Sequence, residues 1–193
     1  MPAQLSLSKQ RGIGLVDLML GAAISLVMML MILHAAVQIG EGRNAHREGE
    51  RLNQGAAALQ SLLEQSGASI INSGSAAGFA NVYAPTASEL KAAGYLPQYW
   101  NPAMPFGGNA QFTVRRGLSN DLLGLVCDSN SLVRRGVAAP DLAAKIVKAS
   151  QGRGIMTSVV NPSQMNGPGM LNVTAPISGP AIVCAWAYLP SPN

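Results

Sequence analysis

Histidine is almost absent from this sequence, and its scarcity excludes several kinds of active site. Only His34 and His46 occur, and no histidine follows them. Hydrolases that use a serine or cysteine nucleophile need a nearby histidine base, so the C-terminal part cannot supply that chemistry. A zinc site needs four ligands of the usual types, and too few are grouped here. We therefore expect no catalytic residues, no metal and no cofactor, and we do not expect an enzyme.

Charged and aromatic residues are also scarce, at 11% and 5% of the chain, and the net charge is only +4. A nucleic-acid surface requires basic residues gathered on one face. The arginine pairs Arg115-Arg116 and Arg134-Arg135 stand apart, so we expect no nucleic-acid partner. Gly107-Gly108 is not followed by the Lys and Ser or Thr of a phosphate-binding loop.

The acidic residues of the C-terminal part form no recognisable site. Asp121 and Asp128 flank one predicted strand and could form a carboxylate pair, but turn positions explain both more simply. With Asn130 they offer too few oxygens for calcium, which takes about six to eight.

The sequence contains two cysteines, Cys127 and Cys184. An even number in an exported chain favours a disulfide between them. Such a bond would stabilise the fold by roughly 4 kcal/mol in the chain-entropy description. Two buried free thiols, or an unpaired site, are the alternatives.

One long apolar run dominates the N-terminal part. Residues 13–37 are nearly all apolar or small, and only Asp17 and His34 carry ionisable side chains. A helix needs about 20 such residues to cross a bilayer, so the run predicts a transmembrane helix. A carboxylate inside a membrane helix costs roughly 3 kcal/mol or more, which makes Asp17 the most informative residue of the run.

Asp17 has no well-placed basic partner, because Arg11 precedes it by six residues and helical neighbours lie three or four apart. Cleavage after Gly12 would leave a free α-amine on Ile13 and would make Asp17 the fifth residue of the new chain. A packed neighbouring copy could then present its amine to this carboxylate. The alternative is an uncut signal-anchor whose Asp17 lies near the lipid headgroups.

The segment 9–19, KQRGIGLVDLM, resembles the type IV prepilin signature. That family has a short basic leader ending in glycine, an apolar residue that becomes the N-terminus, an acid at mature position five and a long apolar helix. The resemblance implies that a prepilin peptidase cuts between Gly12 and Ile13, that Ile13 is N-methylated and that Asp17 acts in assembly. The acid of the family is usually glutamate, and here it is aspartate.

These observations favour an α+β, type IV pilin-like fold, in which a long N-terminal helix forms a spine and a small antiparallel sheet forms a globular head. We divide the chain into a leader (1–12), a transmembrane and filament-core helix (13–39), an amphipathic continuation of that helix (40–66) and the head (67–193).

The helix continuation carries one apolar stripe, expected to pack on the sheet of the head. Its members are Leu52, Ala56, Leu59 and Leu63. The glycines at 40, 42, 49 and 55 weaken the helix and suggest bends or melted turns. Gly67 is the predicted end of the helix.

The head is predicted to contain two helices and five strands. Thr86 and Glu89 form a capping box that opens a short helix ended by Gly94, and a second helix spans residues 141–150. Strands are expected at 110–116, 122–127, 155–160, 172–175 and 181–189, the first two paired as a hairpin. Residues 67–85, 95–108 and 161–170 are expected mainly as loops. Tyr99 and Trp100 form either a ligand platform or, as we favour, a cap on the core edge.

Residues 86–160 are similar to the constant N-terminal part of shufflon-type minor pilins, the PilV-like proteins of type IVb conjugative pili. The shared elements are a Leu-x-x-x-Gly-Tyr-Leu segment, an Asn-Pro followed by glycines, an apolar hairpin and a helix that ends near a glycine. Members of that family carry a variable C-terminal segment that recognises recipient-cell surfaces.

The two resemblances imply a structural or minor subunit of a type IV pilus, with a role in adhesion or conjugation. The precursor would cross the inner membrane once with its head in the periplasm, and the mature chain would reach the cell surface in the filament. Its partners would be other pilin subunits, a prepilin peptidase, an inner-membrane assembly platform and a cell-surface receptor. A type II secretion pseudopilin and an uncut signal-anchored binding protein are the alternatives.

Overall fold

The computed structural model describes residues 14–191. The chain forms two compact units, the first ending at Gly40 and the second beginning at Glu41. Helix α1 (Leu15–Ser73) contributes residues to both units. The other elements belong to the second unit, and they are α2 (Ala87–Ala92), β1 (Ala110–Arg116), β2 (Leu122–Asp128), β3 (Val133–Arg134), β4 (Val137–Ala138), α3 (Pro140–Ala149), β5 (Gly154–Thr157), β6 (Gln164–Gly167), β7 (Met170–Thr174) and β8 (Val183–Leu189).

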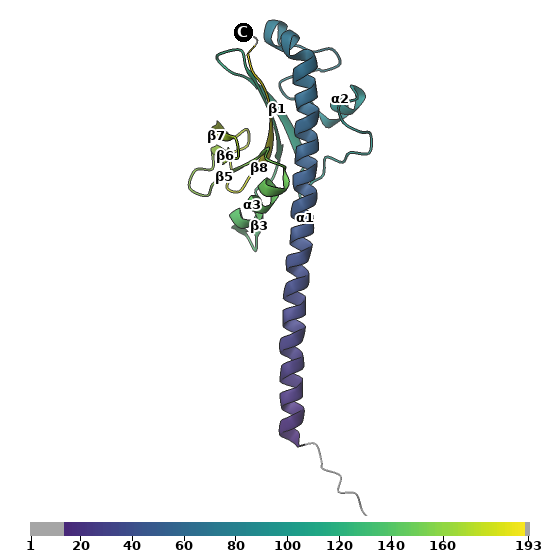
Figure 1. Cartoon of the computed structure of the whole chain (residues 1–193), viewed down its shortest axis with the longest axis vertical. Helices are drawn as coiled ribbons and strands as arrows, with labels where there is room; N and C mark the ends of the chain where they lie inside the picture. The colour runs from purple at the N-terminus through teal and green to yellow at the C-terminus, as the bar shows by residue number, and fades with distance from the viewer. Residues whose placement is uncertain (1–13, 192–193) are drawn as a thin grey trace, which may run out of the picture. The chain divides into compact units, whose positions relative to one another are not determined.

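Six strands of the second unit form one antiparallel sheet in the order β1-β2-β8-β5-β6-β7. The predicted hairpin of β1 and β2 is confirmed, with Ala110 opposite Asp128. The sheet is curled (Figure 1), and the guanidinium of Arg115 on β1 donates to the carbonyl oxygen of Thr174 on β7 at 2.6 Å. The long N-terminal helix and the antiparallel sheet confirm the predicted α+β class.

Both faces of the sheet are buried in separate apolar cores. The predicted stripe of α1 lies in the larger core, and its four side chains have no exposed surface. The smaller core lies on the other face, and its buried members are Leu125, Cys127, Ile155, Met165, Ile182 and Cys184. Because both faces of β2 are covered, this strand is apolar along most of its length instead of alternating.

Three glycines of α1, at positions 49, 55 and 67, allow close packing. The helix is continuous to Ser73, so the predicted end at Gly67 is wrong. A Cβ at Gly67 would lie 2.4 Å from Cδ2 of Leu189, and a Cβ at Gly49 would lie 2.5 Å from Cβ of Ala149. The missing side chains therefore let α1 approach β8 and α3 closely, and this packing outweighs the poor helix propensity of glycine.

The predicted capping box of α2 is confirmed. The Thr86 hydroxyl accepts a hydrogen bond from the Glu89 amide at 3.2 Å, and the Glu89 carboxylate accepts one from the Thr86 amide at 2.7 Å. The hydrogen bonds that the Glu89 carboxylate accepts from the amides of Thr86 and Ala80 lower the pKa of Glu89. Because the motif is local, its residues specify this helix start without help from the rest of the fold.

The segment 161–170, predicted as a loop, contains most of a hairpin. Its residues form β6 and the start of β7, which pair antiparallel. Met165 is fully buried in the smaller core, and Asn166 pairs with Met156 of β5. Burial of an apolar side chain and pairing with a distant strand outweigh the turn-rich composition here.

The other predicted strands are shifted at their ends. The strand expected at 155–160 is β5, which ends at Thr157, and Val160 beyond it is 95% exposed. The strand expected at 181–189 is β8, which begins at Val183. The second predicted helix, which Pro140 and Asp141 were expected to start, is α3, and it ends at Ala149, one residue earlier than expected.

Candidate functional site: the N-terminal helix and the buried carboxyl pair

The first unit contains a helix whose apolar side chains have no partner. From Val16 to Ile39 its large apolar side chains are 49% to 75% exposed. By length and composition this helix could cross a membrane. A surface that is apolar on all sides is unfavourable in water, so this segment requires lipid or other helices around it.

Asp17 lies in the first turn of α1 and is the only acidic residue of the helix before Glu41. Its amide donates to the carbonyl oxygen of Gly14 at 2.9 Å, and its side chain is exposed. A negative charge in the first turn interacts favourably with the helix dipole. The predicted processing residues Gly12 and Ile13, and the leader 1–12, lie outside the described residues.

The other polar groups of this helix are satisfied within it. His34 Nε2 and Gln38 Nε2 are 3.0 Å apart, one turn from each other. The Ser25 hydroxyl donates to the carbonyl oxygen of Gly21 at 2.9 Å. Because these groups already have hydrogen-bond partners, their burial among apolar neighbours costs less than the burial of Asp17.

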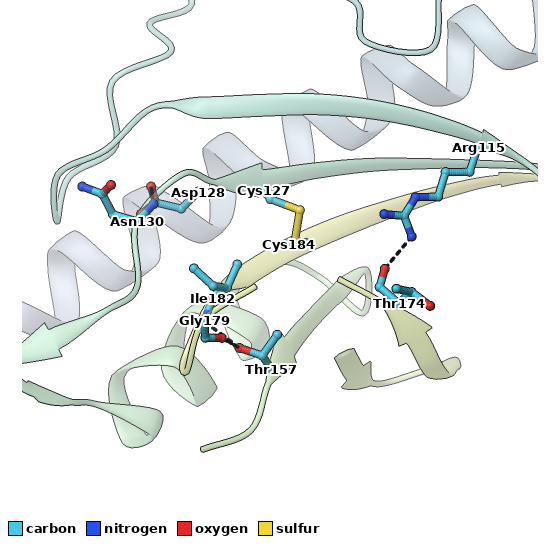
Figure 2. The surroundings of a disulfide bond; sticks show 9 residues. All are labelled: Arg115, Cys127, Asp128, Asn130, Thr157, Thr174, Gly179, Ile182 and Cys184. Atoms are coloured by element: carbon cyan, nitrogen blue, oxygen red, sulfur yellow. Dashed lines mark hydrogen bonds between the residues drawn. A yellow bond between two sulfur atoms is a disulfide. The ribbon is translucent and has the colours of Figure 1, made fainter. Parts of the chain in front are cut away.

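The predicted disulfide is confirmed. Cys127 of β2 and Cys184 of β8 lie directly opposite each other, and their sulfur atoms are bonded (Figure 2). Both residues are fully buried in the smaller core. The bond therefore joins two neighbouring strands whose cysteines are separated by 57 positions in the sequence.

A buried carboxyl pair was not predicted from the sequence. Glu48 lies on α1 and Asp128 ends β2, and neither side chain has exposed surface. The Phe106 amide donates to Glu48 Oε2 at 3.3 Å, and the Asn130 amide donates to Asp128 Oδ1 at 3.1 Å. Within residues 14–191, neither Glu48 Oε1 nor Asp128 Oδ2 has a protein donor. The two side chains interact by a hydrogen bond, which requires that one of the two carboxyl groups carries a proton.

Burial sets the protonation of this pair. Burial raises the pKa of Glu48 to about 8, and the negative charge of Asp128 contributes to the rise. Burial also raises the pKa of Asp128, to about 6, against the lowering effect of its hydrogen bonds from the Asn130 amide and from Glu48. At neutral pH Glu48 therefore holds the proton and donates it to the Asp128 carboxylate.

The position of the pair indicates a structural role. Glu48 connects α1 both to the turn that contains Phe106 and to the end of β2. The turn approaches so closely that a Cβ at Gly108 would lie 2.2 Å from Asp128 Oδ1. Because neither side chain has exposed surface, the pair cannot contact a substrate. Its role is to connect α1 to the end of β2.

The carboxylate pair considered from the sequence does not form, because Asp121 and Asp128 lie at opposite ends of β2. The apolar stripe contained a signal for the actual partner. Glu48 precedes Leu52 by one turn and so lies on the buried face of α1. Among the described residues no three His, Cys, Asp or Glu side chains are grouped closely enough to hold a metal ion.

Tyr99 and Trp100 have different surroundings. Trp100 is 3% exposed and packs on Phe112 with ring centroids 5.7 Å apart, so it belongs to the larger core as favoured. Tyr99 is 87% exposed, so the favoured expectation that it also caps the core edge is wrong.

Comparison of the chain with protein-family models, with curated proteins and with solved structures found no match.

Proposed function

We propose that this chain is a subunit of a type IV pilus. The observation that carries the proposal is an apolar helix, exposed on all sides, whose first turn holds a single acid, the fifth residue after the Gly12-Ile13 junction. The α+β layout of the chain and the confirmed disulfide agree with an exported subunit of this kind.

Assembly is the proposed activity. The precursor crosses the inner membrane by its apolar helix, with the head in the periplasm, and a prepilin peptidase cuts after Gly12. An inner-membrane platform then brings the helices together in a filament, where Asp17 meets the α-amine of Ile13 on a neighbouring copy. Such an ion pair is largely desolvated, so it selects the correct register of neighbouring helices as well as joining them.

Processing is the first expected result. Co-expression with a prepilin peptidase should reduce the mass of the purified protein by that of residues 1–12, and N-methylation should add one methyl group. Mass spectrometry of the intact protein measures both changes. A Gly12→Leu variant serves as the control, because a bulky residue at the cut should leave the chain at full length. A wild-type chain that keeps Met1 would instead favour a signal-anchored binding protein.

Loss of the acid is expected to prevent assembly. In Asp17→Ala the amine of the neighbouring copy would be buried without a partner, at a cost of about 3 kcal/mol or more. Filament yield should fall on the order of 100-fold, measured by immunoblotting of filaments sheared from the cell surface. Asp17→Glu keeps the charge and should assemble. Normal filaments from Asp17→Ala would refute the proposed ion pair.

A further inference from the structure

A polar groove in the second unit lies next to the buried carboxyl pair, because Arg51 in its wall interacts electrostatically with Glu48. Four residues of α1 and three consecutive residues of the loop after α2 line it, and its volume is about 310 Å³. They are Arg47, Glu50, Arg51, Gln54, Tyr99, Trp100 and Asn101.

The groove contains two positively charged side chains that form no ion pair with a carboxylate among the described residues. Arg47 has no carboxylate within 4.0 Å among the described residues, and Arg51 donates to the Ala103 carbonyl oxygen, which is uncharged. The carboxylate of the groove, on Glu50, is bonded to His46 at 3.1 Å. The groove therefore carries a net positive charge, and two arginines one turn apart repel each other unless an anion lies between them.

The indole of Trp100 also lines the groove. The ring is buried, and its Nε1 finds no acceptor within residues 14–191. A buried N–H without an acceptor costs about 1–3 kcal/mol. Because Nε1 itself has no accessible surface, a ligand in the groove cannot reach it, and Trp100 contributes only its ring to the wall of the groove.

Tyr99 contributes an exposed aromatic face to the groove. Tyr99 is 87% exposed and lines the same groove as Arg47 and Arg51, although an aromatic ring gains free energy when it leaves water. A flat aromatic face next to arginines and side-chain amides suits a sugar ring, which offers an apolar face for stacking and hydroxyl oxygens as acceptors.

We propose that this groove binds an acidic saccharide. Arg47 and Arg51 bind its anionic group, which is a carboxylate or a phosphate, and Tyr99 packs on the sugar ring. Asn101 and Gln54 donate to its hydroxyl oxygens. This site goes beyond assembly of the filament and does not depend on Asp17 or on cleavage after Gly12.

Titration of the full-length chain tests the site. The protein is kept in a polyoxyethylene detergent that carries neither sugar nor phosphate, and binding of 3′-sialyllactose, lactose 6′-phosphate and lactose is measured by calorimetry. At least one of the two acidic sugars should bind about tenfold or more tightly than lactose, and the tighter of them identifies the anionic group. Added salt should weaken this binding, because the arginines are partly exposed.

Matched variants locate the site. Arg47→Gln and Tyr99→Ala should each weaken binding of the acidic sugar about tenfold, and Tyr99→Phe should restore most of it. Lys145→Gln, which removes one exposed positive charge from α3, should leave binding unchanged. Melting temperatures of all four variants check that each is folded.

Three results would overturn the proposal. The first is equal binding of lactose and the acidic sugars, which would remove the role of the arginines. The second is an equal effect of Lys145→Gln and Arg47→Gln, which would show attraction to net charge alone. The third is binding of inorganic phosphate or acetate as tightly as the saccharides, which would remove the role of Tyr99.

Discussion

The free energy of unfolding of this chain should fall as the pH rises from about 4.5 to about 8, because Glu48 keeps its proton in the folded state. The pKa of Glu48 rises from 4.5 to about 8 on folding, mainly through burial. Between these values the folded chain holds a proton that the unfolded chain has lost. The stabilisation is therefore complete below about pH 4.5 and is lost as the pH passes through about 8. Asp128 acts in the same direction, because its pKa rises from 3.8 to about 6.

The expected change is on the order of 3 kcal/mol between pH 5 and pH 8.5. Urea unfolding at several pH values, followed by tryptophan fluorescence, measures it, and both tryptophans lie in the second unit. Glu48→Gln cannot titrate but can still accept from Phe106 and donate to Asp128, so its stability should vary much less with pH. Glu64→Gln changes an exposed glutamate of the same helix and should behave like the wild type. Identical pH profiles for wild type and Glu48→Gln would contradict a protonated Glu48 in the folded state.

Removal of the disulfide should cost about 4 kcal/mol of the free energy of unfolding. The bond closes a loop between residues 57 positions apart, and so restricts the unfolded chain. Cys127→Ala combined with Cys184→Ala removes it and leaves small apolar residues in the smaller core. Urea unfolding of the oxidised wild type and of this double variant measures the difference.

A reducing agent provides the internal control for this measurement. It should destabilise the wild type by a similar amount and leave the double variant unchanged. A loss below about 1 kcal/mol in both comparisons would mean that packing alone keeps β2 and β8 together. Leu125, Ile155 and Met165, which are buried in the same core, would then carry that role.

The prediction from sequence succeeded where the signal is local. An unbroken apolar run specifies a helix without reference to other elements, and α1 does cover residues 15–39. The capping box of Thr86 and Glu89 opens α2, and an alternating strand and an apolar strand on either side of a polar turn form the hairpin of β1 and β2. In each case the interacting residues belong to one continuous segment of the sequence.

The prediction from sequence failed where contacts between distant segments compete with the local preference for a helix, strand or loop. Gly67 predicts a helix end, but the helix continues to Ser73. The absence of a side chain at Gly67 allows Leu189 to pack against the helix. Residues 161–170 read as a loop, yet the burial of Met165 and pairing with β5 make part of them a strand. Local propensities differ by about 1 kcal/mol, which the burial of one apolar side chain exceeds.

The amino-acid sequence by itself determined the apolar N-terminal helix, the acid in its first turn, the α+β class and the presence of two cysteines in the second unit. Only the tertiary structure decided that Cys127 and Cys184 lie opposite each other, that Glu48 meets Asp128, and that Trp100 is buried while Tyr99 is exposed. The physical reason is that pairing and burial depend on which segments the sheet brings together, and neither composition nor periodicity contains that information.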